Sequence, residues 1–260
     1  VYLGDCDNII LKDIKFYNNC ARAFTNASST AGYDYKRCIS ILGDGAGGAL
    51  YVSYGRKQEL IDVEFVNNVA THEGGAIYIL GFGYTEMSIT NAVFSYNEAA
   101  GSMKNYDFGA YKLVRGGAIC IYHGNLNLTS AVFSKNIATA SAYSSNYIAS
   151  AYAYGGAIAI TDSANVNISA AKFYSNSAYA EAKGATSVCR AYGGALYACD
   201  GTTQMINTEF QNNAAGSGGA IYLTDSATAT YTVTKGNTVK NIGNDATLGG
   251  FLYLDSDSAM

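Results

Sequence analysis

The stretch GGAIYIL at residues 74–80, followed by FSYNEA at residues 94–99, contains the two motifs that decide the fold. Each motif occurs six times, and the two alternate along the chain. An internal repeat of this kind predicts a stack of similar coils rather than one globular core. The Phe-x-x-Asn-x-Ala copies begin at Phe16, Phe65, Phe94, Phe133, Phe173 and Phe210, and the glycine copies at Gly47, Gly74, Gly116, Gly155, Gly193 and Gly218, with a variant at Gly249.

The repeat length and the apolar pattern identify the kind of coil. The shortest spacings between successive glycine pairs are 25 and 27 residues, and apolar residues alternate over short runs such as residues 77–79 and 158–160. Alternation over a few residues, bounded by Gly, Asn and Asp, predicts short strands with tight corners. Such strands would pair in parallel between coils. We therefore predict an all-β fold, a right-handed parallel β-helix (solenoid) of about seven to eight coils.

Each motif position has a physical reason in such a stack. The glycine pair allows a positive φ and a close approach between the corners of neighbouring coils. The phenylalanines are expected to stack as a buried column. The asparagines three residues later are expected to bond to one another as an amide ladder, and to take the left-handed conformation at the corner.

Four insertions interrupt the bare repeat. They cover residues 20–46, 97–115, 136–154 and 176–192, and the last three are of similar size and rich in Ala, Ser and Tyr. Insertions on one face of a solenoid often form its recognition side. We expect them to stack as a lateral flap that either contacts a partner or serves as structural padding. The chain reads as one β-helix segment, residues 1–260, which begins and stops within a coil and so continues at both ends or is covered there.

A column of tyrosines follows the glycine motif. If the neighbouring Ile and Leu residues face the core, these phenols line the outside of one sheet, where they could stack on sugars or on another protein. The alternative is that tyrosine pairs between coils only stabilise the strands. The predicted contact surface comprises Tyr51, Tyr78, Tyr197 and Tyr222, together with Tyr143, Tyr147 and Tyr152 of one insertion.

Few residues are candidates for a catalytic, metal or cofactor site. Asp162, Asp200 and Asp225 recur at one corner and are weak candidates for a Ca²⁺ site, although Asp is also an ordinary turn residue. The two histidines lie beside no candidate nucleophile, and no basic residue recurs near the aspartates. We predict no catalytic residues and no cofactor. The net charge of −4 without a basic cluster argues against nucleic acid and anionic membranes as partners.

The cysteines and the N-glycosylation sequons give information on the cellular compartment of the protein. Six cysteines without a C-x-x-C pair argue against a zinc or thioredoxin-type site. Disulfides are predicted to involve Cys20, Cys38, Cys189 and Cys199, with buried free thiols as the alternative. Asn26, Asn127 and Asn167 are candidates for N-glycosylation, and the last two share one outward repeat position.

The paired motifs GGAI (residues 74–77, 116–119 and 218–221) and FxxN (residues 94–97 and 133–136) resemble the GGA[ILV] and FxxN repeats of chlamydial polymorphic outer-membrane proteins. The resemblance implies a pectin-lyase-like β-helix and an autotransported or secreted passenger that acts in adhesion. We therefore expect a non-enzymatic structural or adhesive protein, extracellular or at the cell surface. Its expected partners are another copy of itself, end to end or laterally, or a host or neighbour surface protein or glycan. It is not expected to insert into a membrane. The alternative is a carbohydrate-binding or polysaccharide-cleaving β-helix of the pectate-lyase type.

Overall fold

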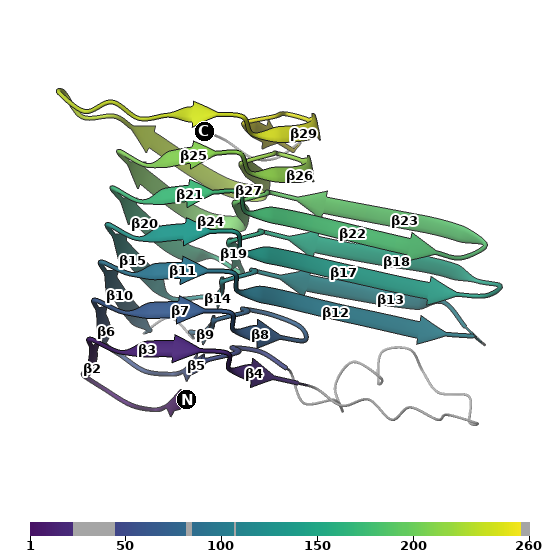
Figure 1. Cartoon of the computed structure of the whole chain (residues 1–260), viewed down its shortest axis with the longest axis horizontal. Helices are drawn as coiled ribbons and strands as arrows, with labels where there is room; N and C mark the ends of the chain where they lie inside the picture. Colours follow the sequence, from purple (N-terminus) through teal and green to yellow (C-terminus); the bar gives the residue numbers. More distant parts are fainter. Residues whose placement is uncertain (23–44, 82–84, 107, 256–260) are drawn as a thin grey trace.

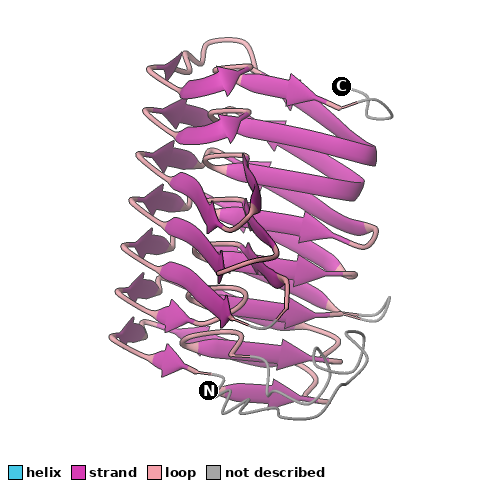
Figure 2. Ribbon diagram, turned by 90° about the vertical axis from the view of Figure 1, so that its right-hand side faces the viewer, coloured by secondary structure: helices cyan, strands magenta, loops and turns pink. Residues whose placement is uncertain are grey.

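The computed structural model describes residues 1–22, 45–81, 85–106 and 108–255. These residues contain strands and loops and no helix (Figure 2). Three sheets of 13, 7 and 10 strands run along the stack, and the strand pairing between coils is parallel in all three (Figure 1). The prediction of an all-β parallel β-helix is confirmed.

The three sheets take their strands from successive parts of each coil. Sheet A contains β1 (Tyr2–Gly4), β2 (Ile9–Lys12), β5 (Leu50–Ser53), β6 (Gln58–Ile61), β9 (Ile77–Leu80), β10 (Glu86–Thr90), β14 (Ile119–Tyr122), β15 (Asn125–Thr129), β19 (Ile158–Thr161), β20 (Ala164–Ser169), β24 (Leu196–Ile206), β27 (Ile221–Thr232) and β30 (Leu252–Leu254). Sheet B contains β3 (Lys15–Tyr17), β7 (Glu64–Val66), β11 (Val93–Ser95), β16 (Val132–Ser134), β21 (Lys172–Tyr174), β25 (Glu209–Gln211) and β28 (Asn241–Ile242). Sheet C contains β4 (Cys20–Ala21), β8 (Val69–Ala70), β12 (Glu98–Asn105), β13 (Ala110–Arg115), β17 (Ile137–Ser144), β18 (Ile148–Tyr154), β22 (Ser177–Lys183), β23 (Thr186–Tyr192), β26 (Ala214–Ser217) and β29 (Asp245–Leu248).

The phenylalanines of the repeat form the predicted buried column. Their rings stack face to face at centroid distances of 4.6 to 4.9 Å, from Phe16 through Phe65, Phe94, Phe133 and Phe173 to Phe210. The last five rings are fully buried among the Ile, Leu, Val and Met side chains that sheets A and B turn inward. Burial of one such side chain contributes on the order of 2 kcal/mol, so the column supplies much of the stability of the stack.

The asparagine ladder is confirmed as well. Each ladder amide accepts from both the backbone N–H and the side-chain Nδ2 of the asparagine in the preceding coil, at 2.8 to 3.1 Å. Its own Nδ2 also donates to the carbonyl of a column phenylalanine, as Asn136 does to Phe94 at 3.0 Å. Because the amides are buried, the ladder satisfies the donors of one corner through the whole stack.

One detail of the asparagine prediction is wrong. The positive φ at this corner belongs to the residue before the ladder asparagine and not to the asparagine itself: Asn67 (φ 54°), Tyr96 (φ 56°) and Lys135 (φ 56°) adopt it. The ladder position needs a side chain with both a donor and an acceptor. The residue before it needs only to tolerate the left-handed conformation, and its identity varies accordingly.

The three similar insertions form a two-layered projection that we call the flap: β12, β17 and β22 run outward, and β13, β18 and β23 return (Figure 1). Within each layer the strands pair in register between coils. Alternate residues of the two layers pack against each other and are nearly all alanine, as in residues 138–142 and 149–153. We call this contact the alanine seam, and its small side chains bring the two layers close together.

Candidate functional site

The tyrosine column does not form the open contact surface predicted from the sequence. Tyr78, Tyr197 and Tyr222 are only 7%, 6% and 2% exposed, and Tyr51 is half-buried. They do lie on the outer side of sheet A, but they belong to a second apolar cluster against that face. The rings of Tyr78, Tyr197 and Tyr222 are therefore not available to stack on a sugar or on another protein.

The cover over the column comes from the residues at the base of the flap. Tyr154 and Tyr192 end the returning strands β18 and β23, directly before a glycine pair, and lie against the column. The Tyr154 ring is 4.5 Å from that of Tyr197, and the Tyr192 ring is 4.1 Å from that of Tyr222. Burial raises the pKa of the Tyr154, Tyr197 and Tyr222 phenols. The column is a structural joint between the flap and the body.

A buried charged group lies at the same joint and was missed by sequence reasoning. Arg115 Nη1 donates to Glu73 Oε1 at 2.7 Å, and the Tyr122 hydroxyl bonds to both residues. Both charged residues precede a glycine pair, where the neighbouring coils place alanine or tyrosine. The ion pair is poorly solvated: the neighbouring Tyr122 and Glu73 raise the pKa of Arg115 against the effect of burial, and burial raises the pKa of Tyr122. The group fixes the first flap strand to the body.

A group of exposed aromatic and aliphatic residues lies at the far end of the flap. Tyr106 and Phe108 are 59% and 58% exposed, and Tyr147 and Ile148 are 49% and 57% exposed. The Phe108 and Tyr147 rings lie 6.4 Å apart, and Tyr106 contacts Tyr143 of the next hairpin. We call Tyr106, Phe108, Tyr147 and Ile148 the flap tip. Of the insertion tyrosines predicted to contact a partner, Tyr147 lies in it and Tyr143 beside it, whereas Tyr152 lies on the outer side of the returning layer against Tyr111.

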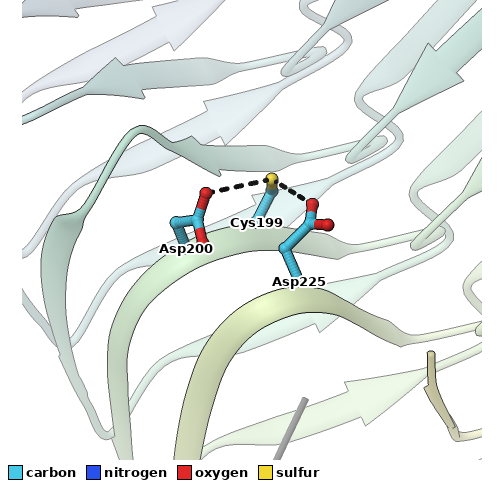
Figure 3. A group of neighbouring side chains, drawn as sticks. All are labelled: Cys199, Asp200 and Asp225. Atoms are coloured by element: carbon cyan, nitrogen blue, oxygen red, sulfur yellow. Dashed lines mark hydrogen bonds between the residues drawn. The ribbon is translucent and has the colours of Figure 1, made fainter. Parts of the chain in front are cut away.

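The acidic corner brings two of its three predicted aspartates together. Asp200 and Asp225 lie in neighbouring coils on either side of Cys199, and one ligand atom of each of the three lies within 4.8 Å of the others (Figure 3). The Cys199 thiol donates to Asp225 Oδ2 at 2.8 Å and lies 3.9 Å from Asp200 Oδ2. Asp162 belongs to the coil below and is not part of this group. The sequence pattern pointed to the carboxylates and missed the sulfur.

The ligand set of this group does not suit calcium. Ca²⁺ takes six to eight oxygen ligands, whereas a thiolate with two carboxylates is closer to what Zn²⁺ accepts. In the structure the sulfur is a hydrogen-bond donor, because burial and the Asp225 carboxylate raise the pKa of Cys199 to about 12. The group is best described as a protonated thiol held by a carboxylate.

The thiol is therefore expected to react slowly, and Asp225 is expected to control the rate. We predict that Asp225→Asn speeds alkylation of Cys199 by iodoacetamide at pH 8 about 3- to 10-fold, because part of the upward pKa shift is removed and the thiolate fraction rises. Peptide mass spectrometry over time measures the rate. Asp162→Asn is the matched control and should leave it unchanged. An unchanged rate in Asp225→Asn would show that Asp225 does not control the thiol.

The predicted disulfides are not seen among the described residues. Cys20, Cys189 and Cys199 are free thiols, and Cys38 lies outside the described residues. Cys189 replaces an alanine on the inner side of the flap, where its sulfur accepts from Ala182 N at 3.0 Å, whereas Cys199 lies on the outer side of sheet A. Cys189 and Cys199 do not pair with each other, because the corner between them turns the two side chains to different faces.

The sequons of neighbouring coils lie side by side. Asn127 and Asn167 are opposite each other on the outside of β15 and β20, and Asn167 Nδ2 donates to Asn127 Oδ1 at 2.9 Å. Their outward position agrees with the sequence pattern, and their glycosylation stays a prediction. Asn26 lies outside the described residues. Within the described part of the chain, no helix has the length and hydrophobicity of a membrane span.

Comparison with known proteins gives one match. The model of the Chlamydia polymorphic membrane protein repeat matches residues 62–80 and 207–224. Both segments run from a column phenylalanine to the following glycine motif in coils without a long insertion, which explains why the other copies escape the match. No curated protein and no solved structure is significantly similar to the chain. The chain is therefore a parallel β-helix in which two segments are similar to the Chlamydia polymorphic membrane protein repeat.

Proposed function

We propose that this β-helix is a non-enzymatic structural and adhesive segment of an extracellular or cell-surface protein. The body is a rigid spacer, and the flap tip is its contact surface with a surface protein or glycan of a host or neighbouring cell. The repeat is one of membrane proteins of Chlamydia, which supports a surface location. The observation that carries the proposal is the flap tip itself, where four large apolar residues are about half exposed or more.

An exposed group of this kind at the end of a projection fits a contact site. Apolar side chains scattered singly over a surface need no explanation, whereas a cluster of aromatic residues marks an interaction site. Tyrosine and phenylalanine supply large contact areas at low entropic cost, and they are enriched in the centres of interfaces. The alanine seam and the strand ladders hold the tip at a fixed distance from the body, so little flexibility is lost on binding.

The alternative, a carbohydrate-binding β-helix, is less well supported. It relied on the tyrosine column as a flat face for sugar rings, and that column is covered by Tyr154 and Tyr192. A glycan partner would have to use the flap tip instead. Polysaccharide cleavage by lyases and hydrolases relies on converging carboxylates with a basic partner. The acidic corner offers two carboxylates and a protonated thiol.

The proposal is tested by binding of the purified chain to cultured epithelial cells. The double variant Phe108→Ala/Tyr147→Ala is expected to reduce bound protein about 10-fold or more, because both rings are lost from the centre of the contact. Tyr96→Ala is the matched control, since Tyr96 is 52% exposed but lies at a corner of the body. Prior treatment of the cells with glycosidases or with trypsin separates a glycan from a protein partner. Equal binding of the double variant and the wild type would refute the flap tip as the contact surface.

A further inference from the structure

The upper edge of the flap is an unpaired double strand edge. Strand β26 pairs with β22 only at Ser177 and with β23 only at Tyr192, because the coil above carries no long insertion. Within the described chain, residues 178–183 and 186–191 thus have no strand neighbour on that side. Such an edge presents a row of backbone N–H and C=O groups that accepts another strand.

The same edge leaves the alanine seam open. Ala140, Ala142 and Ala153 in the middle hairpin are buried, whereas Ala180, Ala182 and Ala191 at equivalent positions in the last hairpin are half-exposed. A cleft of about 660 Å³ lies here. Its lining includes Ala180 and Cys189 of the seam, and Ala214–Gly216 and Asp245 of the two coils above. The alanine seam that joins the three hairpins is therefore left uncovered at the cleft.

We propose that this edge is the interface between two copies of the chain, related by a two-fold axis. The axis passes through both flap layers, so that β22 pairs antiparallel with β22 of the partner and β23 with β23. The two seams then form one continuous apolar layer, and all four unpaired backbone edges gain a neighbour. An isologous contact of this kind closes on itself and gives a dimer.

The body of the molecule excludes the simpler head-to-tail arrangement. A second copy stacked directly on the last flap hairpin would place its own body where the coils of β25, β26, β28 and β29 already stand (Figure 1). With the two-fold axis the partner body lies on the other side of the shared flap. The end of each flap then approaches the wall of the cleft formed by those coils.

Charge and side-chain pattern agree with this packing. Along β22 the small residues 178, 180 and 182 face the seam, and Tyr179, Glu181 and Lys183 are exposed on the other side. In the antiparallel pair of β22 strands, several registers place alanine opposite alanine, and they differ by steps of two residues. The register that places Glu181 opposite Glu181 of the second copy is disfavoured by charge repulsion. The others place Glu181 opposite Tyr179 or Lys183. In the proposed dimer, Lys183 at the outer end of β22 approaches the cleft wall of the second copy, and that wall contains Asp245.

Sedimentation velocity of the chain at about 1 to 100 µM is the first test, and a dimer is the expected species. Ala182→Lys is expected to weaken the dimer about 100-fold or more, because it places a charge in the seam at the edge. Val93→Lys, at an exposed position of β11 in the body, is the matched control and should leave the dimer intact. Circular dichroism checks that each variant is folded.

A second variant changes only exposed charges and avoids any doubt about folding. Lys183→Glu is expected to weaken the dimer about 10-fold, and adding Asp245→Lys is expected to restore it. Hydrogen exchange at residues 179–183 should slow as concentration rises. A monomer up to about 100 µM, an open polymer, or a dimer unaffected by all three substitutions would overturn the proposal. The interface rests on the flap geometry and not on the adhesive role, so either proposal can fail alone.

Discussion

Replacing Gly117 by alanine is expected to destabilise the chain by about 4 kcal/mol or more, which places it among the most damaging substitutions in the molecule. A Cβ at this position would lie 2.0 Å from Gly156 O and 2.6 Å from both C and N of Ile137. All three atoms belong to the backbone of the next coil, so no side-chain movement relieves the clash. The coils would have to separate at a point where Gly117 N donates to Gly155 O at 3.0 Å.

Thermal unfolding followed by circular dichroism measures the effect, with an expected loss of about 10 °C or more in Tm. Gly236→Ala is the matched control, because Gly236 has a φ of +89° but nothing within 4 Å of the added Cβ. It should cost only about 1 kcal/mol for the unfavourable backbone conformation. If the two variants had equal Tm values, close approach between coils would not be the reason for the second glycine of the motif.

The body of the fold could be predicted because its determinants are local and repeated. One phenylalanine, one asparagine and one glycine pair in each coil meet their equivalents in the next, so a sequence period translates directly into a column, a ladder and a corner. Comparison of the six repeats with one another showed which positions keep the same residue type. The positive φ lies at Lys135 and not at Asn136. This could not be predicted, because a left-handed residue at either position fits the same repeat spacing.

The candidate site was harder to predict because it depends on how the flap returns to the body. Tyr154 and Tyr192 cover the tyrosine column from positions that hold alanine, glutamate, arginine or serine in other coils, so no repeat marks them. One signal was present. Cys120 and Ala159 interrupt the column, and small residues in a row of large ones indicate that something else fills the space. The partners of Glu73 and Cys199 likewise come from neighbouring coils and follow from the three-dimensional stacking alone.

Replacing Asn136 by aspartate is expected to produce a pH-dependent loss of stability. Asn136 is fully buried, accepts from Asn97 N and Nδ2, and donates from Nδ2 to Phe94 O and Asn176 Oδ1. The aspartate keeps an oxygen that accepts from Asn97. Its second oxygen takes the place of Nδ2 and faces the oxygens Phe94 O and Asn176 Oδ1. Only the protonated carboxyl group can donate there, so burial and the missing donor raise its pKa in the folded state above the unfolded value of about 3.9.

The direction of the pH dependence follows from that shift. Below about pH 4 the carboxyl group is protonated in both states, and the variant should lose only about 1 to 3 kcal/mol relative to the wild type, from the bond that one proton cannot replace. As the pH rises toward the folded pKa, the unfolded state ionises first, and the loss grows by about 1.4 kcal/mol per pH unit. Urea unfolding of variant and wild type at pH 4, 5.5 and 7 measures the difference.

Asn125→Asp is the matched control: Asn125 accepts from Asn165 Nδ2 at an exposed position, so the carboxylate keeps that bond and its effect should stay within about 0.5 kcal/mol at each pH. A loss in Asn136→Asp that did not change with pH would mean that the ladder tolerates a buried carboxylate, and the continuous chain of amide donors would then not be what specifies asparagine in every coil.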